Sequence, residues 1–187
     1  MNENSIYRKA LMLAVPMMIQ NGITNAVSLV DNLMVGSLGT ESMTGVSIVS
    51  QLLFVFFLAI FGGLSGPGIY GAQYFGRGNK EGYQNVFRLK MWIAAAITLA
   101  GMVAFIMAGK WMIGLYLHGN GGDIDAQETM QHGLDYLHVM LWGLIPFSIT
   151  QVYAGSLREL GESVKPMIGG ICSVVVDGVF YYFFFLC

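Results

Sequence analysis

The sequence predicts an all-α bundle of helices that cross a membrane. Hydrophobic residues make up 55% of the chain and charged residues only 11%, and the mean hydropathy is +0.62. The apolar residues fall into segments that approach or exceed the roughly 20 residues needed to cross a bilayer, which is far longer than a membrane β-strand. These segments are residues 10–35, 46–70, 91–111, 134–157 and 166–187.

The basic residues lie almost entirely on one side of the predicted membrane. Eight of the nine Lys and Arg residues precede the first segment or lie in the connections after the second and fourth, which leaves Lys110 on the other side. Because cytoplasmic loops retain basic residues, we expect a cytoplasmic N-terminus and a fifth helix that ends outside. Lys90 and Lys110 are expected to extend their ammonium groups outward from the two ends of the third segment.

Helix-terminating residues mark the connection between the last two segments. The fourth helix is expected to stop at Gly161, Ser163 is a candidate N-cap, and Pro166 belongs to the first turn of the fifth helix. This short connection predicts an antiparallel pair.

A glycine cluster surrounds Pro67 in the second segment. Small residues at spacings of four allow helix backbones to approach closely, and the proline predicts a local kink. No Gly-Lys-Ser/Thr sequence follows, so a phosphate-binding loop is excluded. The glycines are Gly62, Gly63, Gly66 and Gly68.

Composition excludes several other classes of protein. The formal charge of -2 offers no basic surface for nucleic acid. Cys172 and Cys187 lie inside apolar runs, which favours packing over a disulfide framework. His118 and His132 lie in an acidic outer loop expected at residues 115–133, where a solvated loop is a simpler interpretation than a metal site.

The first segment carries a polar face. Its polar residues fall within an arc of roughly 140° at about 100° per residue, while the opposite side is apolar. They are Gln20, Asn21, Thr24, Asn25, Ser28, Asp31 and Asn32. An aspartate at the centre of a membrane helix costs about 2.5–3.5 kcal/mol on insertion scales, which favours a functional role for Asp31.

The fifth segment contains the second intramembrane carboxylate, Asp177. A carboxylate held away from water can take up and release a proton near neutral pH, and a second carboxylate nearby strengthens that tendency. We therefore predict that Asp31 and Asp177 couple to a cation in the outer half of the bundle. The alternative is a structural role, with Asp31 hydrogen-bonded to Asn32 or Ser28 and Asp177 to Ser173.

Several short motifs resemble those of the multidrug and toxic compound extrusion (MATE) family. Their order and spacing over nearly the whole chain make the resemblance specific. They are Leu13–Pro16, Val30–Gly36 with Leu38–Gly39, Gly71–Gly76, and Leu157–Glu162 with Pro166–Met167.

The resemblance implies two six-helix lobes, of which residues 1–187 would form a single, incomplete N-terminal membrane domain with five helices. It implies export of organic cations or drugs in exchange for H⁺ or Na⁺, with no other cofactor, in the plasma membrane of a bacterium. Asp31 matches the family's coupling aspartate, and Asp177 and Tyr181 stand where the family carries an Asn-x-x-x-Asp/Asn pattern. The expected partners are lipid, the cation substrate and the missing C-terminal lobe, and a sodium ion would bind at Asp31 and Asp177.

Alternating access is a mechanism consistent with both the residues and the resemblance, and Pro16 is a place where the first helix could bend. A hydrophobic substrate cavity could draw on Met17, Met18, Phe54, Phe57 and Tyr153, although ordinary packing is the simpler interpretation for these five. The alternatives are a lipid-linked-sugar flippase of related architecture, a fragment without activity, and a membrane aspartyl hydrolase that uses Asp31 and Asp177. The hydrolase is disfavoured because its Gly-x-Gly-Asp element is absent, so a transporter is predicted and not an enzyme.

Overall fold

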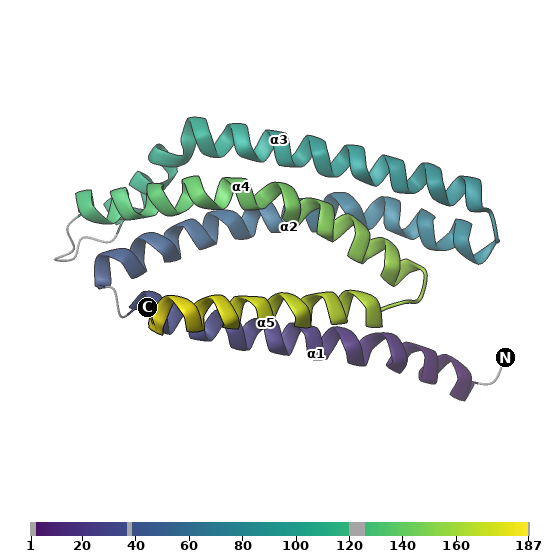
Figure 1. Cartoon of the computed structure of the whole chain (residues 1–187). Helices are drawn as coiled ribbons and strands as arrows, with labels where there is room; N and C mark the ends of the chain where they lie inside the picture. The colour runs from purple at the N-terminus through teal and green to yellow at the C-terminus, as the bar shows by residue number, and fades with distance from the viewer. Residues whose placement is uncertain (1–2, 37–38, 120–125, 187) are drawn as a thin grey trace.

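The computed structural model describes residues 3–36, 39–119 and 126–186, and all its regular structure is helical (Figure 1). This confirms the predicted fold class and the order of the five helices. The elements are α1 (Glu3–Gly36), α2 (Thr40–Gly76), α3 (Lys80–Gly119), α4 (Ala126–Glu159) and α5 (Val164–Leu186).

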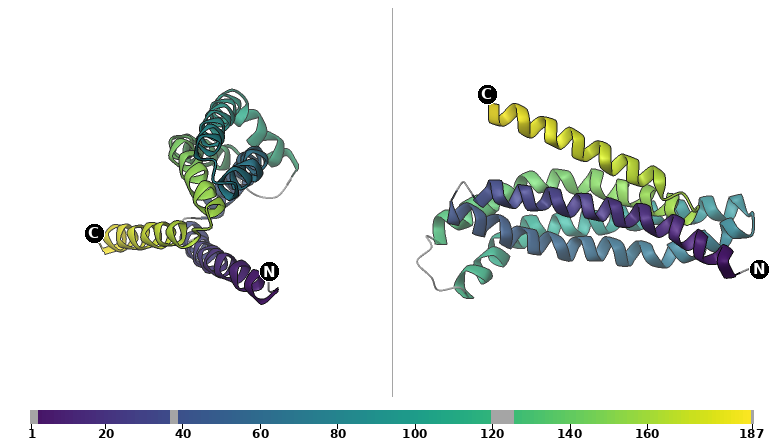
Figure 2. Two further views of the ribbon diagram at one scale, coloured as in Figure 1. Left: turned by 90° about the vertical axis from the view of Figure 1, so that its right-hand side faces the viewer. Right: turned by 90° about the horizontal axis from the view of Figure 1, so that it is seen from below.

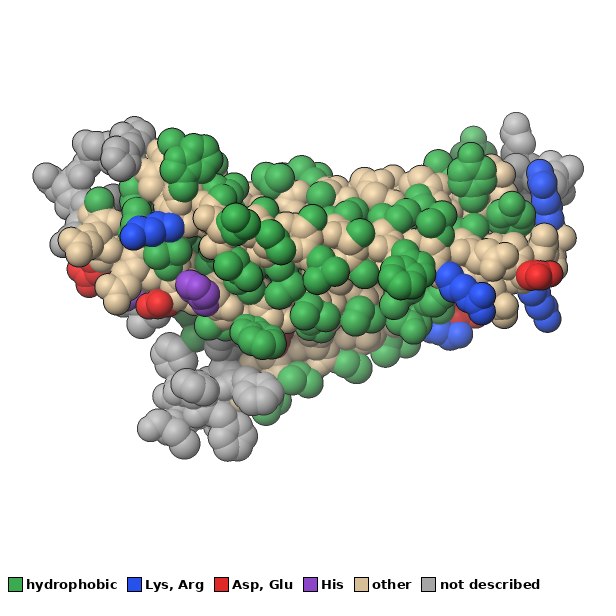
Figure 3. Space-filling model, turned by 90° about the horizontal axis from the view of Figure 1, so that it is seen from above, with side chains coloured by type: hydrophobic (Ala, Val, Ile, Leu, Met, Phe, Trp, Pro, Cys, Tyr) green, Lys and Arg blue, Asp and Glu red, His purple; other side chains and the backbone are tan. Residues whose placement is uncertain are grey.

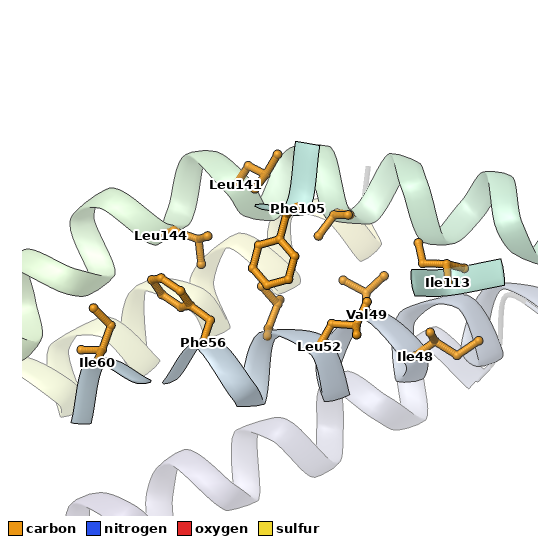
Figure 4. Packing of buried hydrophobic residues seen from close by; sticks show 11 residues of the cluster. Ile48, Val49, Leu52, Phe56, Ile60, Phe105, Ile113, Leu141 and Leu144 are labelled. Carbon is orange, nitrogen blue, oxygen red and sulfur yellow. The ribbon is translucent and has the colours of Figure 1, made fainter. Parts of the chain in front are cut away.

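Helices α2, α3 and α4 pack into a three-helix bundle around one apolar core (Figure 2). Buried residues on α2 recur every three or four positions, as expected for one face of a helix. Phe56 of α2 and Phe105 of α3 meet in this core with ring centroids 6.5 Å apart (Figure 4). The core residues are Ile48, Val49, Leu52, Leu53, Phe56, Ile60, Phe105, Ile113, Leu137, Leu141 and Leu144.

The outer ends of α2 and α4 approach each other through glycine. A Cβ atom added at Gly45 would lie 2.8 Å from the backbone oxygen of Thr129 and 2.9 Å from the backbone nitrogen of Gly133. Only a residue without a side chain fits between two backbones at this distance.

Helices α1 and α5 pack on each other beside this bundle, as the two views of Figure 2 show. They converge where the side chain of Gln20 lies against Gly170, so that a Cβ added at Gly170 would be 3.0 Å from Nε2 of Gln20. From there α5 diverges from α1 toward the C-terminus.

The two turns on the predicted cytoplasmic side are built alike. In each, a glycine with positive φ follows the helix, Gly78 at 71° after α2 and Gly161 at 81° after α4. The amide of Glu162 donates to the carbonyl of Leu157 at 2.9 Å and that of Gly161 to Arg158 at 3.0 Å, which is the Schellman pattern of helix termination. The prediction for Gly161 is thus confirmed.

Ser163 does not cap α5 through its side chain, as the sequence analysis expected. Ser163 directly precedes Val164, as an N-cap would, but its buried hydroxyl has no hydrogen-bond partner among the described residues. Asn79 is a true cap on the other turn, because its Oδ1 accepts from the amide of Gly82 at 2.9 Å.

Helix α2 continues through Pro67. The four glycines around this proline do not all have the same role. Gly63 packs against the side chain of Ile97 and Gly68 against that of Glu159, as close packing requires. A Cβ at Gly62 or Gly66 would meet nothing within 4 Å. The packing prediction therefore holds for two of the four.

The surface is that of a membrane protein. Charged side chains gather at the two ends of the face in Figure 3, and apolar side chains cover its middle. Residues 40–76, 80–117 and 126–159 form helices long and apolar enough to cross a membrane, and each extends beyond its predicted span. The extension is physically simple, because polar residues continue a helix past the apolar core of the bilayer. Membrane spans in α1 and α5 stay predictions.

The contact between α2 and α4 gives a first prediction. We expect Gly45→Val to lower the free energy of unfolding by about 1–3 kcal/mol, because two backbones would have to separate to admit the side chain. Thermal unfolding in detergent measures this. Gly62→Val is the matched control, since open space surrounds Gly62 on the same helix. Equal unfolding midpoints for the two variants would contradict the packing.

Candidate functional site

Asp31 lies in the second-to-last turn of α1 and is half-buried. Its carboxylate is close enough to Tyr136 of α4 for a direct Coulomb interaction, and the Tyr136 side chain is hydrogen-bonded to Ser50 of α2. Asp31 therefore lies near a phenol of α4 that is itself bonded to α2.

The other predicted site residues are more open. Asp177 is exposed on α5, as is Ser173, and within the described side chains Asp177 makes no hydrogen bond or ion pair. The side chain of Tyr181 lies outside the described residues. Gln20 on the polar face of α1 is half-buried, and the remaining residues of that face are exposed. These are Asn21, Thr24, Asn25, Ser28 and Asn32.

Gln20 links the α1–α5 pair to the three-helix bundle. Its Oε1 accepts a hydrogen bond from Nη2 of Arg158, in the last turn of α4, at 3.3 Å. Its backbone carbonyl accepts from the hydroxyl of Thr24 at 2.9 Å. The inner end of the polar face is therefore held by a guanidinium group, and its outer end carries Asp31.

A buried charged cluster that the sequence did not predict lies at the cytoplasmic end of the bundle. The ammonium group of Lys90 on α3 forms an ion pair with both carboxylate oxygens of Glu159 on α4. Lys90 is only 2% exposed, and its Nζ also lies 3.4 Å from Oγ of Ser156. Tyr83 donates its hydroxyl proton to the carbonyl of Ser156 at 3.2 Å. The expectation that Lys90 extends outward is wrong, because Glu159 offers it a partner inside the bundle.

Helix α2 closes this cluster with two glycines. A Cβ added at Gly68 or Gly71 would lie 2.7 Å or 2.6 Å from a carboxylate oxygen of Glu159. Both glycines are buried, so the carboxylate rests against the α2 backbone. The spacing of three residues places them on one face of α2, where they leave room for the acid.

A cavity of about 130 Å³ adjoins the cluster. Residues of α2 supply its apolar wall and the hydroxyl of Ser65, and α3 and α4 supply its other polar groups. Its lining comprises Ile60, Phe61, Leu64, Ser65, Lys90, Gln151, Val152, Gly155, Arg158 and Glu159.

A larger cavity of about 320 Å³ lies between α3 and α4 and is almost wholly apolar. The hydroxyls of Thr98 and Ser148 in its lining donate to carbonyls of their own helices. The five residues proposed for a substrate cavity line neither space. Phe57 packs on Phe147 with ring centroids 4.4 Å apart, and Tyr153 packs on Phe87 at 5.3 Å. Met17 is half-buried, and Met18 and Phe54 are exposed.

The MatE family model matches residues 16–183, which is most of the chain. The chain belongs to the MATE family. It is 24% identical over 177 residues to "Multidrug resistance protein MdtK" of Pectobacterium atrosepticum, covering 95% of this chain and 37% of that protein. No solved structure is significantly similar.

Two further relatives carry the name "Probable multidrug resistance protein NorM". The protein of Synechocystis is 28% identical over 161 residues, covering 86% of this chain and 33% of the relative. The protein of Thermotoga maritima is 24% identical over 163 residues, covering 87% and 34%. The chain therefore spans about a third of the length of the curated MATE relatives that it matches.

Two features of the amino-acid sequence of this MATE chain point to the buried cluster. Glu159 lies in the Leu157–Glu162 motif by which the chain resembles the family, and it ends an apolar helix. Lys90 is the eleventh residue of α3, about three turns inside the helix, and so lies within its apolar part and not at its start. An acid and a base that each adjoin apolar residues on neighbouring helices are the signal for a buried pair.

The ion pair yields a second prediction. We expect Lys90→Met to lower the free energy of unfolding by about 3–5 kcal/mol, because the largely buried Glu159 carboxylate would lose the ammonium group that neutralises it. Adding Glu159→Gln should restore most of the loss. Thermal unfolding of the purified variants measures both effects.

The control is Lys165→Met, which breaks the exposed pair of Lys165 with Glu162. Its loss should be about 1 kcal/mol or less, as for surface pairs in general. A double variant as unstable as Lys90→Met alone would show that the charge imbalance is not the cause.

Proposed function

We propose that the protein is a secondary active transporter that exports organic cations or drugs in exchange for protons or sodium ions. Membership of the MATE family and relatives named as multidrug resistance proteins support this proposal. The observation that carries it is Asp31, a half-buried acid on a polar helix face within electrostatic reach of Tyr136. We further propose a bacterial cytoplasmic membrane as its location.

The polar face of α1 favours a cationic ligand. Asp31 is the single ionisable residue among positions 20–32, so this stretch of α1 has a formal negative charge, and the guanidinium group of Arg158 meets the face at Gln20, eleven positions before Asp31. A lipid-linked sugar with its phosphates would be repelled there. The ionisable side chain and the amides around it offer oxygen atoms, which are suitable ligands for a proton or Na⁺.

The way the helices are grouped supports alternating access as the mechanism of this proposal. Helices α2, α3 and α4 share a continuous core, while α1 and α5 pack mainly on each other. Binding of a cation at Asp31 would change the charge of α1 next to Tyr136 and so change how α1 sits against the bundle. A proton moving down the membrane potential supplies about 2.3 kcal/mol per 100 mV to drive such a cycle. In this proposal Asp177 contributes a second acid on α5.

The test is efflux of a fluorescent organic cation from cells that produce the protein at its full natural length. We expect efflux that depends on pH or sodium, and we expect Asp31→Asn to abolish it at unchanged membrane abundance, because an amide cannot exchange a cation. Asp135→Asn is the control, since Asp135 is an exposed aspartate on α4. Undiminished efflux by Asp31→Asn, or equal loss in both variants, would refute the role of Asp31.

A further inference from the structure

We propose that the cavity at the cytoplasmic end of α2 and α4 binds the phosphate group of an anionic lipid from the inner leaflet, with Arg158 as the group that holds it. This site meets the polar face of α1 at its inner end, through the hydrogen bond of Arg158 with Gln20, and does not include Asp31. The inference does not depend on the proposed transport activity.

The charge of the cavity selects an anion. Three charged side chains line it, and two of them, Lys90 and Glu159, neutralise each other as an ion pair. The positive charge of Arg158 remains. An organic cation would therefore be repelled, and a phosphate group would be attracted.

Arg158 also has unused hydrogen-bonding capacity. Its Nε is buried and has no hydrogen-bond partner among the described residues, and its Nη2 donates to Gln20 at a long 3.3 Å. A buried donor without an acceptor is unfavourable, so an acceptor bound beside Arg158 would stabilise it. A guanidinium group offers parallel N–H donors to two oxygens of one phosphate, which is a geometry that Lys cannot supply.

The shape and depth of the cavity select a lipid over free phosphate. Arg158 lies in the last turn of α4, at the end of the bundle where the basic loops place lipid headgroups. From there the apolar wall of Ile60, Phe61 and Leu64 leads into the membrane. Exposed Phe54, Leu58 and Phe61 continue it along one face of α2, at the spacing of successive helical turns. An acyl chain would cover this face, whereas inorganic phosphate would leave it bare.

The experiment is native mass spectrometry of the full-length protein with dioleoyl phosphatidylglycerol, dioleoyl phosphatidylcholine or inorganic phosphate. Arg158→Gln removes the charge. Gly155→Leu fills the cavity and keeps the charge, because Gly155 lines the cavity and a Cβ there meets nothing within 4 Å. Gly143→Leu is the matched control on the same helix, equally unobstructed and outside the cavity lining.

We expect phosphatidylglycerol to bind more tightly than phosphatidylcholine, and Arg158→Gln and Gly155→Leu each to weaken it by about tenfold or more. Gly143→Leu should bind like the wild type. Unchanged binding by Gly155→Leu, or equal weakening by Gly143→Leu, would overturn the site even if Arg158→Gln failed to fold. Binding of inorganic phosphate without binding of phosphatidylglycerol would show that the bound phosphate group does not belong to a lipid.

Discussion

Lys90 and Glu159 neutralise each other at the cytoplasmic end of the three-helix bundle, and the arrangement of α2, α3 and α4 there depends on that pairing. Glu159 can approach the α2 backbone because Gly68 and Gly71 have no side chains, and Lys90 can be buried because Glu159 receives it. Each charge alone would be strongly unfavourable away from water. The pair therefore fixes the register of three helices at once, while the apolar core above it supplies most of the packing.

Charge is handled differently on the α1–α5 pair. Asp31 lies within electrostatic reach of the Tyr136 phenol, and Asp177 is exposed. Arg158 meets this pair only at its inner end, through Gln20. The bundle thus pairs its acid with a base, whereas Asp31 on the neighbouring helix lies near a phenol. In the proposed transport cycle this difference would let the scaffold stay intact while the charge at Asp31 changes.

The sequence predicted the parts of the fold that depend on local pattern. Apolar runs predicted five helices, and Gly161 predicted the end of α4 because a positive φ is a local requirement. The direction of the Lys90 side chain could not be predicted from its sequence neighbours. A lysine near the end of an apolar run has the same local sequence whether its side chain extends to water or turns inward to an acid. That choice is made by Glu159, 69 residues away in sequence. The exposed positions of Asn21 and Asp177 likewise depend on how α1 and α5 pack, which periodicity does not encode.

The acids Glu159 and Asp31 differ in their roles. Glu159 is paired with Lys90, and in the proposed cycle Asp31 binds an exchangeable cation. Infrared difference spectroscopy of the purified protein, recorded on addition of protons or Na⁺, tests this division most directly. We predict that the carboxyl bands that respond to the cation disappear in Asp31→Asn and persist in Glu159→Gln. Bands that persist in Asp31→Asn and disappear in Glu159→Gln would contradict the account.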